Sequence, residues 1–597
     1  MEQEIKNRYE ALARQYQLQL EKKKLRLRII SWLRLGSFLS IIAVFIFLIP
    51  VSQLIGWGAV FVCLLAFLLL VKQSVGTEKQ LNYYQNLVEI NLNEIRGIQR
   101  DFSQFDPGKE FIHPDHDFSF DLDLFGENSF FQFLNRTVTS GGKNKLAGSV
   151  QTSSQNVETI RKKQLAVTEL AEYFDWRQQF LASGRNSDDN VSSEIILHQK
   201  EPVLLKHSSF LKIILVALPA VTIVFGVLWI VGSIPEQLFY AAVFVQWVLF
   251  LSYSKTIGNF KKIYGLRTKV LLRYVDMLLL IEKKEFRSEY LNHQKSKLFN
   301  HGKPASQITS SLQKILNELD YSQNILVGFV LDSIILWDIR CIYRLHKWQK
   351  TYGGQLAEWF EVIAELDSLI SLANLNYNHP EWTVPVVNTN GFMVQAENLG
   401  HPLIAREKRI DNHFEISNQE QIVIITGANM AGKSTFLRTV GINLILASQG
   451  CKVCATEFRF SPARLFTNMR TTDNLMKDES YFYAELLRLK YMLDLLHNGE
   501  NLFIIIDEML KGTNSVDKLN GSVELLKQLI LLETHCIVAT HDLKLTELAG
   551  SFPAAIKNQC FEVNLSGDEL RFDYKLKEGV TGTMNATFLM KKMGIIQ

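Results

Sequence analysis

The chain has 597 residues, a length that allows several domains with separate cores. Its formal net charge of +3 excludes the strong basic excess of many nucleic-acid-binding proteins. The hydrophobic content of 47% and the mean hydropathy of +0.03 are high for a soluble protein and low for a transporter. The six cysteines are scattered, as in proteins of a reducing compartment, and only Cys451 and Cys454 lie close together, which is a weak metal or redox signal.

The N-terminal 73 residues predict a basic helix followed by a membrane hairpin. Residues 1–28 end in the basic run Lys-Lys-Lys-Leu-Arg-Leu-Arg and are expected to be a cytoplasmic helix. Residues 29–73 hold two apolar runs, Ile29 to Pro50 and Leu54 to Val71, and each approaches the ~20 residues that span a bilayer. A cleaved signal peptide is excluded, because the first run is too long, starts late and is followed at once by another.

A second apolar pair predicts another transmembrane hairpin over residues 211–254. Its runs are 213–232, which contains Pro219, and 238–252, which is short and contains Gln246. A buried soluble helix is the alternative for any one run, but two pairs with basic flanks favour membrane spans. Because Lys and Arg flank both pairs and are missing from the short connectors, every soluble part is expected in the cytoplasm.

The segments around the second hairpin predict a divided helical domain. Residues 75–210 are its first part, beginning with a long polar helix over 75–102, and residues 255–380 are its second part, with an amphipathic helical region over 337–375. Pro380 and Pro385 mark its end, and residues 381–597 form a further domain.

That last domain contains a phosphate-binding loop. Residues 427–435 read Gly-Ala-Asn-Met-Ala-Gly-Lys-Ser-Thr and follow the apolar run 422–425, which predicts strand, Gly-rich turn and helix. Backbone N–H groups and the helix N-terminus hold phosphates there. Lys433 is expected to contact the β- and γ-phosphates and Ser434 to bind Mg²⁺, so the sequence predicts a nucleoside triphosphate site.

Two later strands end in candidate catalytic residues. The apolar run 502–506 is followed by Asp507, a candidate Mg²⁺ ligand, and by Glu508, a candidate for polarising the attacking water. His541 follows the apolar residues 537–539, at the strand edge where α/β sheets bind ligands. A strand that merely ends in acids and a structural histidine are the alternatives.

The pattern Thr-Gly-x-Asn-Met-x-Gly-Lys-Ser-Thr resembles the ATPase domain of the MutS family, the mismatch-repair clamps and their relatives. Further segments resemble that family in the same order: 457–469 as the strand after the P-loop helix, 472–486 as the composite-site signature, 502–508, 511–515 and 539–542. The resemblance implies ATP and Mg²⁺ as ligands, an ABC-type α/β P-loop domain and an all-α core or lever domain, and the apolar runs add transmembrane helical hairpins to this fold. It implies nucleotide-binding roles for Gly427, Asn429, Gly432, Lys433, Ser434, Thr435 and His401 (beside the adenine), metal-binding roles for Ser434 and Asp507, and catalytic roles for Glu508 and His541 (the γ-phosphate sensor).

Ser480 is the residue on which the implied dimer depends. In the family a serine of this segment reaches the γ-phosphate bound by the partner subunit, which implies a homodimer with composite sites. The alternative is an N-cap for the helix that begins at Tyr481. Two departures from the family are Tyr481 itself, where Thr is usual, and residues 509–511, which replace a Gly- and Arg-containing stretch.

The rest of the chain resembles the family only in part. Residues 121–137 resemble the opening of the core domain and residues 161–167 its next helix, but no mismatch-recognition or connector domain is expected. The apolar hairpins and the resemblance together predict a membrane-anchored MutS-like ATPase. The resemblance implies that it acts on DNA, and the alternative is a DNA-independent membrane-acting mechanical or signalling ATPase. An ABC transporter is disfavoured, because Leu-Ser-Gly occurs only at 565–567, after the Asp507 strand. Candidate DNA contacts, which are otherwise solvated or at lipid headgroups, are Lys143, Lys145, Lys162, Lys163, Lys261, Lys262 and Arg267.

Overall fold

The computed structural model describes residues 2–185, 208–264, 268–300, 302–322, 325–428, 430–470, 481–511, 514–566 and 569–582. The chain divides into two compact units. The first comprises residues 1–137, 144–178 and 368–597, and the second comprises residues 138–143 and 179–367.

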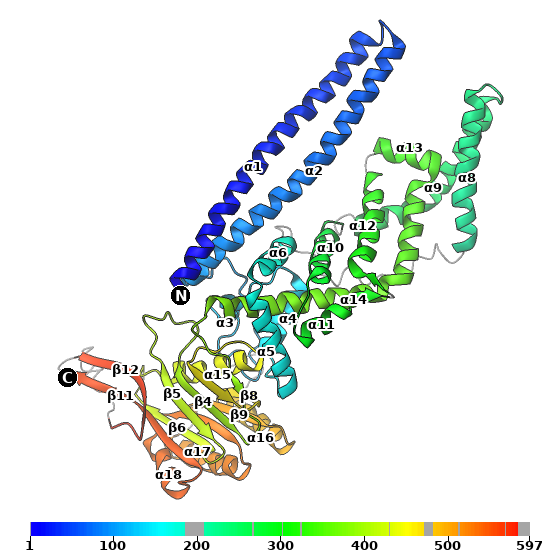
Figure 1. Ribbon diagram of the computed structural model, residues 1–597. Helices are drawn as coiled ribbons and strands as arrows, with labels where there is room; N and C mark the ends of the chain where they lie inside the picture. The colour runs from blue at the N-terminus through cyan, green and yellow to red at the C-terminus, as the bar shows by residue number, and fades with distance from the viewer. Residues whose placement is uncertain are drawn as a thin grey trace. The chain divides into compact units, whose positions relative to one another are not determined.

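The first unit begins with two long antiparallel helices (Figure 1). Helix α1 covers Glu2–Ala43 and continues as a π-helical turn over Val44–Leu48, and α2 covers Gln53–Ile98. The predicted basic helix and first apolar run are therefore one helix. The second apolar run and the predicted polar helix are also one, which ends at Ile98 rather than residue 102. The change from apolar to polar residues does not interrupt α2, because Lys, Gln and Glu are good helix formers.

Four described helices are long and apolar enough to cross a membrane, judged by length and composition. They are Glu2–Leu48, Ile55–Ile98, Leu211–Ile230 and Glu236–Lys255. Each of these helices contains most of one apolar run of the sequence, and the first two extend well beyond their runs.

The C-terminal part of the first unit is built on a six-stranded sheet with the order β12-β11-β6-β10-β9-β8. Neighbouring strands are parallel except for the antiparallel pair β11 and β12. Their bounds are β6 Ile422–Gly427, β8 Arg464–Asn468, β9 Leu502–Asp507, β10 His535–Thr540, β11 Ile556–Ser566 and β12 Glu569–Glu578. The pairing aligns Val538 of β10 with Ile424 of β6 and Ile506 of β9, so the carboxyl ends of the three central strands lie together.

Helices cover both faces of this sheet (Figure 1). Helix α15 (Lys433–Ser448) lies on one side. On the other side α16 (Tyr481–His497), α17 (Ser515–Leu531) and α18 (Leu548–Ser551) enclose a core with Ile424, Ile504 and Val538, all of them fully buried. Strands buried on both faces require continuous apolar runs, which is what the sequence contains.

A smaller four-stranded sheet, β3-β7-β4-β5, belongs to the same unit. Its strands are β3 Val386–Val387, β4 Met393–Leu399, β5 Asn412–Ser417 and β7 Glu457–Phe460. The single strand expected over residues 457–469 is therefore wrong, because β7 and β8 belong to different sheets. Pro462 lies between them and has no N–H for a sheet ladder, which accounts for the break.

The second unit is helical and includes the second apolar pair. Its helices are α8 Ser208–Ile230, α9 Glu236–Tyr264, α10 Thr268–Lys283, α11 Glu289–Ser296, α12 Ala305–Tyr321 and α13 Ile325–Ile335. A short hairpin, β1 Phe299–Asn300 with β2 Lys303–Pro304, precedes α12. Helix α14, Trp337–Asn378, begins in this unit and ends in the first, and α4 (Ser140–Val150) and α6 (Phe174–Gly184) also have residues in both. Helices α3 (Phe130–Leu134) and α5 (Val157–Glu172) belong to the first unit.

Candidate nucleotide site

The turn between β6 and α15 has the backbone that a phosphate-binding loop needs. Gly427 ends β6, and a Cβ placed there would lie 2.8 Å from the carbonyl oxygen of Phe561. Gly432 precedes α15 with φ of +103°, a conformation that side chains disfavour. The two glycines thus permit a close strand contact and a sharp helix entry. Asn429 lies outside the described residues.

Lys433 is held inside this loop. Its Nζ donates to the carbonyl oxygens of Gly427 at 2.7 Å and Ala428 at 3.1 Å, and it lies 3.4 Å from Nε2 of His541. The side chain is only 6% exposed. Burial lowers its pKa below the usual value, and the carboxylates of Asp507 and Glu508 oppose that shift. A buried lysine within a Gly-rich loop is placed to bind the negatively charged oxygens of a polyphosphate.

Ser434 and Asp507 meet as the sequence predicts. The Ser434 hydroxyl donates to Oδ2 of Asp507 at 2.5 Å, which joins the start of α15 to the end of β9. A hydroxyl and a carboxylate supply the oxygen ligands that Mg²⁺ prefers, and this ion commonly takes few protein ligands beside substrate phosphates. Among the described residues no group of three or more His, Cys, Asp or Glu side chains is arranged to hold a metal by itself. The pair therefore fits a Mg²⁺ site that a phosphate completes.

Glu508 and His541 form the second pair of the site. Nε2 of His541 lies 2.7 Å from Oε1 of Glu508, across the neighbouring ends of β9 and β10. The backbone of Glu508 has φ of +60° and its N–H donates to the carbonyl of Ala539 at 2.9 Å, so the strand end is fixed while the side chain turns toward His541. The hydrogen bond from His541 lowers the pKa of Glu508 to about 2. The carboxylate is ionised at neutral pH, as a group that polarises water must be.

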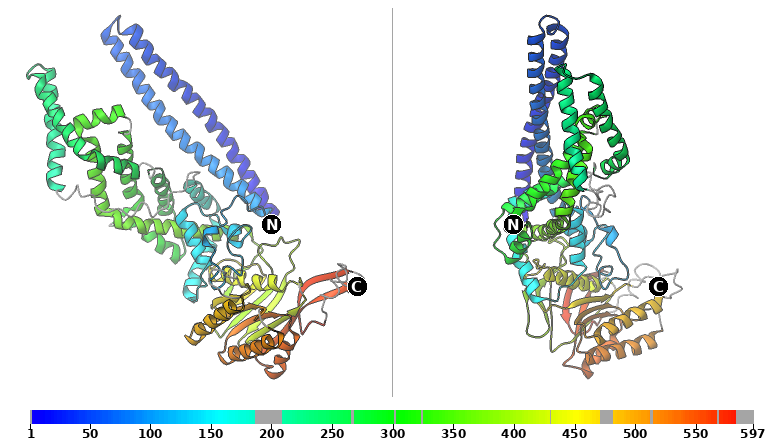
Figure 2. Two further views of the ribbon diagram at one scale, coloured as in Figure 1. Left: turned by 180° about the vertical axis from the view of Figure 1, so that it is seen from behind. Right: turned by 90° about the vertical axis from the view of Figure 1, so that its right-hand side faces the viewer.

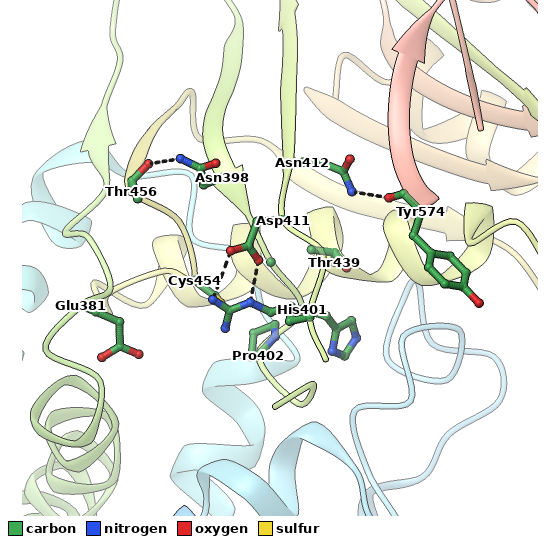
Figure 3. Close-up of polar contacts among 12 residues, drawn as sticks. Glu381, Asn398, His401, Pro402, Asp411, Asn412, Thr439, Cys454, Thr456 and Tyr574 are labelled. Atoms are coloured by element: carbon green, nitrogen blue, oxygen red, sulfur yellow. Dashed lines mark hydrogen bonds and ion pairs between the residues drawn. The ribbon is translucent and has the colours of Figure 1, made fainter. Parts of the chain in front are cut away.

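These groups line one cavity of about 730 Å³, a size typical of ligand sites. The predicted residues that line it are His401, Gly432, Lys433, Ser434, Thr435, Asp507, Glu508 and His541. Asn412 and Tyr574 also line it, and the Asn412 side chain donates to the Tyr574 carbonyl at 3.1 Å (Figure 3).

His401 also lines the cavity. Figure 3 shows it beside Pro402, and its Nδ1 accepts the N–H of Leu403 at 3.2 Å. Burial, with the nearby charges of Arg438 and Arg100, lowers the pKa of His401 to about 4. The imidazole is therefore uncharged at physiological pH where it lines the cavity.

Glu485 has a role that its sequence context did not predict. This carboxylate is 1% exposed and accepts the backbone N–H groups of Leu510 at 2.6 Å and Lys511 at 3.1 Å. It therefore holds the loop that follows Glu508. The sequence signal was an acid within the mostly apolar start of α16, where a buried charge needs partners.

Arg100 was also missed. It lies just beyond the end of α2 with φ of +66°, and its Nη1 donates to the carbonyl of Pro402 at 2.8 Å. The long N-terminal hairpin thus contacts the segment that carries His401. Nothing in the local sequence of Arg100 indicated a partner 302 residues away.

Some of the residues predicted to contact a partner subunit or DNA lie outside the described residues, and others bind partners within the chain. Ser480 lies outside the described residues, so its dimer and N-cap interpretations stay predictions, and Arg267 is outside them as well. Among the candidate DNA contacts, Lys162 pairs with Glu158 at 2.8 Å, Lys163 donates to Gln449 at 3.3 Å, and Lys261 pairs with the buried Asp338 at 2.5 Å. Lys261 is therefore neither a solvated nor a purely headgroup-facing lysine.

Comparison with known proteins matches the part of the chain that forms this site. The family model of MutS domain V matches residues 423–591. The MutS protein homolog 4 of Mus musculus is 29% identical over 289 residues, which are 46% of this chain and 27% of that protein. The DNA mismatch repair protein MutS of Thermotoga maritima is 30% identical over 252 residues, 41% of this chain and 31% of that protein. The DNA mismatch repair protein MutS of Staphylococcus saprophyticus is 30% identical over 274 residues, 44% of this chain and 30% of that protein. The matches thus span less than a third of the length of these relatives, and residues 423–591 of this chain belong to the family of MutS domain V.

Proposed function

We propose that this chain is a Mg²⁺-dependent ATPase that two helical hairpins anchor in a membrane, with its catalytic domain in the cytoplasm. The observation that carries the ATPase proposal is the convergence of Lys433, the Ser434–Asp507 pair and the Glu508–His541 pair on one cavity. ATPase domains of this class need the same three elements: a phosphate-binding cation, a metal-binding pair and a base beside a γ-phosphate contact.

The residues of the chain divide the work of hydrolysis. The loop N–H groups and the N-terminus of α15 bind phosphate oxygens, and Lys433 exchanges the Gly427 and Ala428 carbonyls for the β- and γ-phosphates. Mg²⁺, held by Ser434 and Asp507, supplies charge neutralisation when bound. Glu508 polarises the water that attacks the γ-phosphorus as the bond to the β-phosphate oxygen breaks. His541 exchanges its contact with Glu508 for the γ-phosphate.

The proposed assembly is a homodimer with composite sites. It rests on the resemblance of residues 472–486 to the signature segment of the family, with Ser480 contacting the nucleotide of the partner subunit. A chain that dimerises in this way hydrolyses ATP faster per subunit as its concentration rises through the dimer dissociation constant.

Membrane anchoring is supported by the four long apolar helices. Exposed apolar side chains cover them, such as Phe47 at 73%, Phe61 at 66% and Phe244 at 68%, whereas water-soluble proteins rarely expose large contiguous apolar surfaces. The basic residues at the open ends of both hairpins favour a cytoplasmic catalytic domain.

The first candidate for the role of this ATPase is action on DNA, because two of the matched relatives are named DNA mismatch repair protein MutS. A mismatch-repair-like role predicts DNA binding that weakens as the salt concentration rises, since phosphate contacts release counterions.

The second candidate is a DNA-independent ATPase that moves its membrane hairpins, and one contact favours it. Arg100 joins the end of hairpin helix α2 to Pro402, next to His401 in the nucleotide cavity. A shift of the nucleotide-binding wall would therefore reach the hairpin through a single hydrogen bond.

The two candidates are separated by measuring ATP hydrolysis by the purified full-length chain in lipid nanodiscs. The rate is measured with and without double-stranded DNA over a series of salt concentrations. Stimulation by DNA that fades with salt supports DNA action. The membrane-acting alternative is supported if DNA does not change the rate of hydrolysis at any salt concentration and Glu508→Ala abolishes that hydrolysis. Absence of Mg²⁺-dependent hydrolysis in all samples contradicts the ATPase proposal itself.

A further inference from the structure

Helix α13, Ile325–Ile335, is the most apolar element of the second unit that the hairpin prediction did not include. Its sequence is Ile-Leu-Val-Gly-Phe-Val-Leu-Asp-Ser-Ile-Ile, and only Asp332 and Ser333 are polar. Eleven residues give a helix of about 16 Å, which is too short to cross ~30 Å of hydrocarbon. Apolar stretches of this length are buried core helices or segments that enter a membrane without crossing it.

The polar groups near the end of α13 are bonded to the second hairpin and to the start of α14. Nε1 of Trp247 donates to the Ser333 hydroxyl at 2.9 Å. The Gln246 side chain donates to the carbonyl of Ile334 at 3.2 Å and to the Thr222 hydroxyl at 2.6 Å. Oδ1 of Asp332 accepts the backbone N–H of Asp338 at 2.8 Å. These inward bonds give the Trp247 indole N–H, the Ser333 hydroxyl and the Ile334 carbonyl partners within the protein, as lipid surroundings require, while Oε1 of Gln246 has no partner among the described residues.

These contacts set the depth of α13 relative to the hairpin. Gln246 follows Glu236 by ten residues, about 15 Å along α9, and Thr222 lies about 17 Å beyond Leu211 in α8. Both positions are near the middle of their candidate spans, Glu236–Lys255 and Leu211–Ile230. Ile334, which contacts Gln246, is therefore at the mid-depth of the hairpin. Helix α13 packs against both α8 and α9, and it lies beside α9 in Figure 1 and in the left view of Figure 2.

The residues just before and just after α13, Ser322 and Asp338, both contact Lys261. Nζ of Lys261, beyond the candidate span of α9, donates to the carbonyl of Ser322 at 3.2 Å and pairs with Asp338 at 2.5 Å. The Ser322 hydroxyl also donates to Asp338. The chain therefore leaves the level of Lys261 after Ser322, reaches the mid-depth of the hairpin at Ile334 and is back beside Lys261 at Asp338.

We infer that residues 325–335 form a re-entrant segment whose outer face contacts lipid acyl chains. The inference rests on the membrane anchoring proposed above. Phe329, 54% exposed, and Ile334, 38% exposed, would face the lipid, while Ser333 and the Ile334 carbonyl face the hairpin. The second hairpin with α13 is thus a three-helix membrane element, and α14 begins at its cytoplasmic edge.

The test places one environment-sensitive fluorophore at Phe329→Cys in the full-length chain, reconstituted in liposomes. The background is Cys63→Ser, since the other five cysteines are buried. Phe244→Cys on α9 is the membrane reference, and Val516→Cys on α17, 67% exposed, is the aqueous reference. Each sample is quenched by nitroxide-labelled lipids and, separately, by aqueous iodide, and its ATP hydrolysis is measured to verify folding.

The inference predicts that lipid nitroxides quench the Phe329 label as they quench the Phe244 label, and that iodide loses access to it. If iodide reaches the Phe329 label as readily as the Val516 label while Phe244 stays lipid-quenched, the re-entrant segment is contradicted and the anchor stands. If iodide reaches both Phe329 and Phe244, the anchor and the segment fall together.

Discussion

Arg100 donates a hydrogen bond of 2.8 Å to the carbonyl oxygen of Pro402, which ties the end of the first hairpin to the wall of the nucleotide cavity. His401, the residue before Pro402, lines that cavity, and the bond from Arg100 is made to this segment and not to Glu508. The contact is therefore placed to affect nucleotide affinity more than the chemical step.

Arg100→Ala is expected to raise the KM for ATP by roughly tenfold or more with kcat nearly unchanged, since a hydrogen bond from a charged group is worth about 1.5–3 kcal/mol. Steady-state kinetics in nanodiscs measures both constants. Arg96→Ala, an exposed arginine in the last turn of α2, is the matched control and should behave as wild type. An Arg100→Ala protein with wild-type KM would show that the contact is only structural.

Glu485→Gln tests the support of the loop after Glu508. The amide keeps one acceptor oxygen where the carboxylate serves two backbone N–H groups, so one of Leu510 and Lys511 is left without its partner. We expect kcat to fall on the order of tenfold, because small displacements of catalytic groups are costly. ATP binding should persist. Glu524→Gln, an exposed glutamate on α17, provides the control. Equal kcat in the two variants would rule out a positioning role for Glu485.

The pH dependence of kcat/KM tests the Glu508–His541 pair. The bond from His541 lowers the pKa of Glu508 to about 2, so in the wild type Glu508 stays ionised down to strongly acidic pH. In His541→Asn that bond is weakened, the pKa rises toward its usual value near 4.5, and Glu508 protonates at higher pH.

The acidic limb of kcat/KM, which reports groups of the free enzyme, should therefore move to higher pH in His541→Asn than in wild type. Rates measured from about pH 4 to 8, with aliquots returned to neutral pH to verify reversibility, give the two profiles. Superimposable acidic limbs would mean that the pair does not persist in solution.

Arg340 compensates for a proline in the second hairpin. Pro219 has no N–H, so within α8 the carbonyl of Leu215 lacks its usual donor, and the Arg340 guanidinium donates to that oxygen at 2.6 and 3.1 Å. Arg340→Ala should lower the free energy of unfolding by about 1–3 kcal/mol. In a Pro219→Ala background, where the backbone supplies the donor, the loss should be smaller.

A double-mutant cycle of thermal unfolding in one detergent measures the coupling between Arg340 and Pro219. Lys350→Ala on the exposed surface of α14 is the control. Additive effects of the two substitutions would contradict the compensation.

The sequence predicted the centre of the site because each signal there is local. An uninterrupted apolar run ended by Asp507 and Glu508 marks a buried strand and its carboxyl edge, and the glycines around Lys433 mark the turn before α15. Parallel pairing of β6, β9 and β10 then brings these ends together without further information. Pro462 is also a local signal of a break between two strands, but the resemblance to one strand of the family led to the prediction of a single strand there.

The features that the sequence did not predict depend on distant partners. Glu485 is explained by backbone N–H groups 25 and 26 residues later, and Arg100 by a carbonyl 302 residues away. Helix α13 is too short to be recognised as a span, and only its bonds to Gln246 and Trp247 reveal its depth. Periodicity and motif spacing contain no information on such pairings.

The most direct test of the central claim measures ATP binding and ATP hydrolysis on the same nanodisc samples of wild type and Glu508→Ala. Glu508 polarises water but does not hold phosphate, so the variant should bind ATP with an affinity close to wild type and hydrolyse it at least ~100-fold more slowly. Hydrolysis at the wild-type rate in Glu508→Ala, or a wild-type protein that does not bind ATP with Mg²⁺, would contradict the account.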